Sequence, residues 1–92
     1  MKGLISMTKL FDKHEYVAYP STVVNFSYEL KKIVSDYQNK KLSNAEITEI
    51  VKFYADTQPE KLFTNNEYNI TVQRLVGKKR LDIVETLLKN SI

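Results

Sequence analysis

Cysteine is absent from the chain, and histidine, glycine and proline are scarce. The 92 residues include no cysteine, two glycines, two prolines and a single histidine, His14. The absence of cysteine excludes disulfide bonds, cysteine nucleophiles and thiolate metal sites. One histidine leaves little scope for imidazole chemistry. Because glycine and proline are rare, few positions force the backbone out of regular structure.

The sequence also lacks a long hydrophobic run and a strong excess of either charge. No stretch approaches the roughly 18 apolar residues of a membrane span, and the apolar run within residues 1–7 is too short for a secretory signal. Lysine and arginine number 14 against 11 acidic residues, which gives a net charge of +3. That charge is mild for a protein whose affinity comes from neutralising phosphates. We therefore expect a cytoplasmic protein that makes no membrane contact.

The length and composition predict one globular domain. Domains usually need roughly 100 to 200 residues, so the chain has no room for a second core. Hydrophobic residues make up 42% of the chain and charged residues 27%. Such a chain can bury enough apolar surface to offset the entropy of ordering, which argues against wholesale disorder.

Two antiparallel helices are expected between residues 22 and 56. Ser21, behind Pro20, is the expected N-cap of the first helix. A capping box at residues 43–46 starts the second, and the short connection at residues 40–42 makes the two helices neighbours. Their apolar side chains recur at spacings of three and four: Val23, Phe26, Leu30, Ile33, Val34 and Tyr37, then Ile47, Ile50, Val51 and Tyr54.

Three further helical segments are expected after residue 56. Capping signatures at residues 57–60 and 64–67 predict a short turn through Phe63 and then a helix with Tyr68, Val72, Leu75 and Val76 on its buried side. Gly77 stands where a left-handed residue would end that helix. A last helix should run to about Asn90, with Glu85 and Lys89 paired. A single helix through Gly77, at a cost of about 1 kcal/mol relative to alanine, is the alternative.

Residues 14–19 alternate loosely in polarity and are rich in tyrosine and valine, which favour a strand that Pro20 would end. A single strand has no partner in a helical chain. Three arrangements stay open: an extended arm packed over the bundle, edge-to-edge pairing of two copies, and a hairpin with residues 4–11. We expect residues 1–20 to form an extended or mobile arm.

The predicted fold is all-α, a small bundle of four to five helices over residues 21–92. The predicted core residues are Phe26, Leu30, Ile33, Ile47, Ile50, Val51, Leu75, Leu81, Val84 and Leu88.

A run of three cations, Lys78, Lys79 and Arg80, follows Gly77 and is the sharpest functional signal. Two helices joined through glycine, the second with cations at its start, have the outline of a helix-turn-helix, and Arg74 adds a fourth cation. Acidic residues further along the same helix would oppose a phosphate backbone. The run also fits a solvated first turn.

No cluster of residues predicts a metal site or a catalytic site. Residues 12–15 carry three ligand-type side chains, but neighbours in an extended segment point to opposite sides and no second histidine is present. Glu46 and Glu49 lie one turn apart in polar surroundings that would not raise a carboxyl pKa. We expect no enzyme activity, metal, cofactor or small-molecule substrate.

Several aromatic residues do not fit the helical stripes and predict a protein interface. Tyr28 and Phe53 fall off the stripes of their helices, and Tyr16 and Tyr19 belong to the arm. If exposed, they form a tyrosine-rich surface of the kind that protein interfaces favour. Burial of these helices on two sides is the alternative.

Three stretches resemble a family of short bacterial proteins: residues 30–37 (LKKIVSDY), 66–68 (NEY) and 75–81 (LVGKKRL). The resemblance extends from about Tyr19 to Leu88, three quarters of the chain. The family is one of short proteins without an assigned activity from low-GC Gram-positive bacteria and their phages and mobile elements. It implies an intracellular bacterial or phage setting and transfers no catalytic residue.

The sequence thus predicts a non-enzymatic regulator or inhibitor. It would bind a protein partner, or a second copy of itself, through the arm and the off-stripe aromatics. The alternative is a nucleic-acid-binding regulator that uses the basic turn at residues 77–80 together with Arg74.

Overall fold

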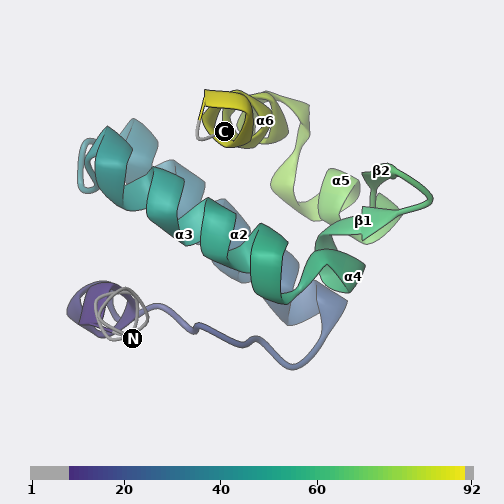
Figure 1. The fold of residues 1–92 in the computed structure, drawn as a ribbon, viewed down its shortest axis with the longest axis horizontal. Coiled ribbons are helices and arrows are strands. Elements are labelled where there is room, and N and C mark those ends of the chain that lie inside the picture. The colour runs from purple at the N-terminus through teal and green to yellow at the C-terminus, as the bar shows by residue number, and fades with distance from the viewer. Residues whose placement is uncertain (1–8, 91–92) are drawn as a thin grey trace.

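The computed structural model describes residues 9–90 of the chain (Figure 1). In this part, residues 9–14 are helical and five helices follow: α2 (Val23–Gln38), α3 (Asn44–Thr57), α4 (Pro59–Leu62), α5 (Ile70–Val76) and α6 (Lys78–Asn90). A short antiparallel hairpin of β1 (Phe63–Thr64) and β2 (Glu67–Tyr68) lies between α4 and α5. The all-α class is as predicted. Of the helices in residues 9–90, none has the length and apolar character needed to cross a bilayer.

Helices α2 and α3 lie side by side and run in opposite directions, as predicted (Figure 1). The N-cap of α2 is Thr22 rather than Ser21, because the Thr22 hydroxyl accepts the amide of Asn25 at 3.0 Å. The predicted capping box of α3 is present. Ser43 Oγ accepts the Glu46 amide at 3.1 Å, and Glu46 Oε1 accepts the Ser43 amide at 3.0 Å.

The capping prediction at residues 57–60 is wrong in detail. The Thr57 hydroxyl donates back to the Phe53 carbonyl at 2.7 Å and so remains within α3. The N-cap of α4 is Gln58, whose side chain makes no capping hydrogen bond. Pro59 occupies the first turn of α4 as expected.

The capping prediction at residues 64–67 is also wrong, since these residues form the hairpin. Asn65 and Asn66 have φ values of 52° and 68°. Asparagine tolerates this conformation, and two such residues make the tight turn that matches the twist of an antiparallel pair. Helix α5 therefore begins later than expected, at Ile70, and its N-cap is Asn69, whose side chain accepts the Thr71 amide at 2.8 Å.

Gly77 separates α5 from α6, as predicted. Its φ of 92° and ψ of 153° lie outside the left-handed helical region expected from the sequence, in a region that only glycine enters readily. A side-chain carbon built at Gly77 would meet only the Arg80 Nη1 atom, 3.8 Å away. The glycine is therefore required by the backbone conformation and not by lack of space.

The N-terminal segment, residues 9–22, differs from the expected arm. Residues 9–14 form a helix, and Glu15, with a φ of 60°, ends it. Residues 16–22 then cross the bundle without regular structure to the start of α2 (Figure 1). These later residues correspond to the packed extended arm. The predicted hairpin with residues 4–11 falls partly on residues 1–8, which lie outside the described residues, and its remaining residues are helical.

The core lies between the helix pair α2–α3 and the later helices. Of the ten predicted core residues, eight are buried, whereas Leu75 and Leu88 are half-buried and their neighbours Val76 and Leu87 take the core positions. The buried hydrophobic residues are Phe11, Tyr16, Phe26, Leu30, Ile33, Val34, Leu42, Ile47, Ile50, Val51, Tyr54, Leu62, Val72, Val76, Leu81, Val84 and Leu87.

Candidate functional site

Three hydrogen bonds between the backbone of residues 17 and 18 and side chains of α2, α3 and residue 58 hold the extended part of the N-terminal segment on the bundle. The Tyr54 hydroxyl donates to the Val17 carbonyl at 2.6 Å, and Gln58 Nε2 donates to the Ala18 carbonyl at 2.8 Å. The Val17 amide donates to Glu29 Oε1 at 2.9 Å. Because these bonds use the backbone of residues 17 and 18, the side chains of Val17 and Tyr19 are left on the surface, where both are exposed.

Four exposed hydrophobic side chains gather where this segment meets α2. Val17 and Tyr19 are 51% and 62% exposed, and Val24 and Tyr28, one turn apart on α2, are 46% and 55% exposed. We call these four residues the tyrosine face. The fifth large exposed hydrophobic residue of the described chain, Ile70, starts α5 and is 66% exposed. Clustered exposed apolar side chains are typical of interaction surfaces.

A groove of about 360 Å³ runs into the tyrosine face. Within residues 9–90, the hydroxyls of Tyr19 and Tyr28 have no hydrogen-bond partner. The side-chain amide of Asn25 has one contact among the described residues, from Nδ2 to Ser21 Oγ at 3.5 Å. The groove thus combines aromatic surface with hydrogen-bond donors. Its lining residues are Val17, Tyr19, Pro20, Ser21, Asn25, Tyr28 and Glu29.

Of the four predicted interface residues, the structure places Tyr19 and Tyr28 together on this surface, and it buries Tyr16. Tyr16 is only 7% exposed, so it does not meet the condition of exposure on which its predicted interface role depends. Phe53 is half-buried, because its ring packs against Phe11 with centroids 5.2 Å apart and against Tyr19 at 5.5 Å. Phe53 therefore packs against Tyr19 of the tyrosine face and is not itself one of its exposed residues.

Two residues of the tyrosine face were missed by the sequence analysis, and one of them had a signal. Val24 lies off the apolar stripe of α2, as Tyr28 does, and an isolated valine there attracts less notice than a tyrosine. Val17 had no such signal, because its exposure depends on its backbone, whose amide donates to Glu29 on α2 and whose carbonyl accepts from Tyr54 on α3.

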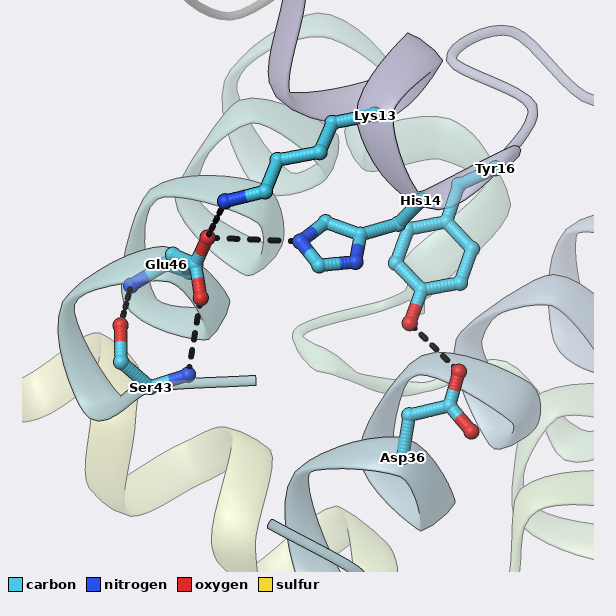
Figure 2. A network of polar contacts seen from close by, with 6 residues as sticks. All are labelled: Lys13, His14, Tyr16, Asp36, Ser43 and Glu46. Carbon is cyan, nitrogen blue, oxygen red and sulfur yellow. Dashed lines mark hydrogen bonds and ion pairs between the residues drawn. The ribbon is translucent and has the colours of Figure 1, made fainter. Parts of the chain in front are cut away.

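A polar network joins the start of the N-terminal segment to the helix pair, and Figure 2 shows its six side chains converging. Lys13 Nζ and His14 Nε2 each lie 3.3 Å from Glu46 Oε2. The hydrogen bond from the Ser43 amide and the contact with His14 lower the pKa of Glu46 to about 2. The Glu46 carboxylate therefore has two roles: it completes the N-terminal cap of α3, and it contacts Lys13 and His14 of the N-terminal segment.

Tyr16 forms the second connection in this network. Its hydroxyl donates to Asp36 Oδ2 at 2.6 Å, and its ring stacks on His14 with centroids 5.5 Å apart. Lys32 Nζ lies 5.5 Å from the centre of the same ring. Burial, followed by the hydrogen bond to Asp36, raises the pKa of Tyr16 above its usual range. Tyr16 thus remains neutral and acts as a hydrogen-bond donor at physiological pH.

These titratable groups pair with one another and hold no metal-type constellation. Asp12, His14 and Glu15, which the sequence places together, do not converge, and His14 turns to Glu46 instead. In residues 9–90 no group of three histidine, aspartate or glutamate side chains is placed to hold a metal ion. The network fits a structural tether between the N-terminal segment and the bundle.

The basic turn is only partly available to a ligand. Arg74, Lys78 and Lys79 are exposed. Arg80 is half-buried, with Nε donating to Ser35 Oγ at 3.1 Å and Nη1 to the Val76 carbonyl at 3.2 Å. Arg80 therefore joins α6 to α2 and to the end of α5. It thus differs from the other three candidate cations, whose side chains are exposed.

Of three comparisons with known proteins, one gave a match, and that match is to a protein family. A search of curated proteins and a search of solved structures each found no match. A family model described as "Conserved hypothetical protein" matches residues 17–89. The match includes the whole tyrosine face and begins after Tyr16, so it leaves out the helical turn at residues 9–14. The bacterial group suggested by the sequence stays a prediction. The chain belongs to this family of conserved hypothetical proteins.

Proposed function

We propose that this protein is a non-enzymatic regulator or inhibitor that binds another protein through the tyrosine face. The observation that carries the proposal is the clustering of Val17, Tyr19 and Tyr28, each more than half exposed, around one groove, with Val24 exposed one turn from Tyr28 on α2. Tyrosine is enriched at protein interfaces and at their energetic hot spots, because its ring gives a large contact area and its hydroxyl gives a hydrogen bond.

The polar side chains of the molecule support a binding role over a catalytic one. The one histidine is engaged with a carboxylate, His14 with Glu46, and the carboxylate of Asp36 accepts the Tyr16 hydroxyl. A general base must instead reach a proton of a bound substrate. The tyrosine face, by contrast, has hydroxyl groups without partners in the described chain.

Affinity capture from cells of the source organism tests this proposal, using the tagged full chain and two matched variants. Tyr28→Glu places a charge in the tyrosine face, and Ile70→Glu places the same charge on a similarly exposed apolar residue elsewhere. We expect a protein captured by the wild type and by Ile70→Glu to be lost with Tyr28→Glu. Equal capture by both variants would contradict the proposal.

Nucleic-acid binding is the alternative proposal, and the exposed side chains of Arg74, Lys78 and Lys79 support it. Its test is a titration with duplex DNA at several salt concentrations. Affinity that falls steeply with salt and collapses when both lysines are changed to alanine would favour it over the protein-binding role. Retention of affinity in that double variant would count against the basic turn as the contact.

A further inference from the structure

We propose that the groove of the tyrosine face binds a proline-rich segment of the partner in the polyproline II conformation. This inference rests on the proposed function and names the chemistry of the occupant.

The groove has the aromatic lining that proline-rich segments require. Two tyrosines from separate elements line it, Tyr19 from the extended segment and Tyr28 from α2, together with Val17 and the ring of Pro20. Pyrrolidine rings pack on tyrosine rings, and aromatic-lined grooves are the common feature of domains that recognise proline-rich peptides. The polyproline II helix suits a short groove because it is already extended before it binds, so little ordering entropy is lost.

The hydrogen-bonding groups of the groove match a ligand that has acceptors and few donors. A polyproline II segment makes no internal hydrogen bonds, so its carbonyls face outward, and each proline lacks an amide proton. The residues that line the groove carry four side-chain donor groups, namely the hydroxyls of Tyr19, Ser21 and Tyr28 and the Nδ2 amide of Asn25. The two tyrosine hydroxyls have no partner within residues 9–90, and Asn25 Nδ2 has one long contact of 3.5 Å to Ser21 Oγ.

The backbone beside the groove argues against an added β-strand as the occupant. Strand addition needs free amide and carbonyl groups on the receiving edge. Here the Val17 amide is bonded to Glu29, and the carbonyls of Val17 and Ala18 are bonded to Tyr54 and Gln58. These three backbone groups are therefore not available to an added strand. A ligand whose own backbone needs few donors, such as a proline-rich segment, fits that arrangement.

Glu29 adds a preference for charge. One of its oxygens accepts the Val17 amide, and Glu29 is one of the residues that line the groove. A lysine or arginine next to the prolines would pair with this carboxylate. Since an exposed ion pair contributes little to binding, we expect the charge to orient the peptide more than to tighten its binding.

Titration of the full-length ¹⁵N-labelled chain with a synthetic decapeptide tests the inference. The probe carries a Pro-x-x-Pro core and one terminal arginine, and the control peptide has alanine in place of each proline. We expect saturable shifts of amides around Tyr19 and Tyr28 with the probe alone. We expect Tyr19→Ala and Tyr28→Ala to weaken binding by about tenfold or more. Tyr28→Phe, which removes only the hydroxyl, should weaken it by about three- to tenfold.

Ile70→Ala is the matched control and should leave the affinity unchanged, because Ile70 is exposed on α5 and does not line the groove. Glu29→Gln keeps the acceptor for the Val17 amide and should reduce affinity about threefold for the arginine peptide and not for a neutral one. Absence of binding by the probe, or equal binding of the alanine peptide, would overturn the inference. So would a dimer in sedimentation that Tyr28→Ala dissociates, because a second copy would then occupy the groove.

The two proposals fail in different ways. If no proline-rich peptide binds but Tyr28→Glu still abolishes capture of the partner, the inference is wrong and the proposed function stands. If capture is insensitive to Tyr28→Glu, the proposed function is wrong and the inference falls with it.

Discussion

The hydroxyl of Tyr16 donates to the carboxylate of Asp36 at 2.6 Å, and this bond joins the N-terminal segment to α2 across 20 residues of sequence. Since Tyr16 is nearly buried, removing the hydroxyl leaves the carboxylate without its donor. We expect Tyr16→Phe to lower the free energy of unfolding by about 1–3 kcal/mol, as for other hydrogen bonds to charged groups.

Urea unfolding at neutral pH measures this effect, with Tyr28→Phe as the control. The Tyr28 hydroxyl has no partner in residues 9–90, so its loss should change stability by no more than about 0.5 kcal/mol. If the two variants unfold at the same urea concentration, the bond from Tyr16 to Asp36 contributes nothing to the tether.

The pKa of Glu46, about 2 against an ordinary value of 4.5, predicts a loss of stability in acid. Between these two pH values the unfolded chain binds the proton more readily than the folded protein does, so acid favours unfolding. The stabilisation by Glu46 is therefore fully present above pH 4.5 and disappears as the pH falls through 2. Glu46→Gln should flatten this part of the stability profile.

Unfolding free energies of the wild type and of Glu46→Gln between pH 2 and 5 check that prediction. Glu49→Gln is the matched control, because Glu49 is exposed on the same helix, less than one turn away. A wild-type profile that keeps its acid slope after Glu46→Gln would show that another carboxyl group is responsible.

The hairpin turn predicts opposite effects of two substitutions at Asn66, which has a φ of 68°. Glycine adopts this conformation at no steric cost, so Asn66→Gly should leave the stability unchanged or raise it slightly. A valine there should cost about 1–2 kcal/mol, because a branched side chain is strained at positive φ. Thermal unfolding followed by circular dichroism distinguishes the two, and equal melting temperatures would argue against the turn.

Gly77 gives a related prediction with a different cause. At its φ of 92° and ψ of 153°, an alanine should cost about 1–3 kcal/mol even though the added methyl group has room. Lys79→Ala, an exposed change within the first turn of α6, should cost no more than about 0.5 kcal/mol. Were Gly77→Ala as stable as Lys79→Ala, the chain would adopt another connection between α5 and α6.

Regular helices were the part of this fold that local sequence could predict. The spacing of Phe26, Leu30 and Ile33 identified α2, and the Ser43–Glu46 box located the start of α3, because both signals act within a few residues. Local patterns were ambiguous at residues 64–67. There a threonine and a glutamate three apart matched a capping box, while two intervening asparagines suited the turn that formed.

The candidate site could be predicted only in part, since burial of the aromatic residues depends on distant neighbours. Tyr28 was identified because it leaves the stripe of its own helix. Tyr16 was an interface candidate because of its position in an arm. In the structure its hydroxyl bonds to Asp36 on α2, and Lys32 of the same helix lies over its ring. Phe53 is covered by Phe11 from a helix that the sequence did not reveal. Only the folded chain brings these residues together.

Site-specific photocrosslinking in cells shows whether the tyrosine face contacts another protein. A photoreactive phenylalanine analogue is placed at Tyr28 in one strain and at Ile70 in another, two positions that are 55% and 66% exposed. Binding through the tyrosine face should give a discrete crosslinked protein adduct from position 28 and none from position 70. The same adducts from both positions, or an adduct from position 70 alone, would contradict it.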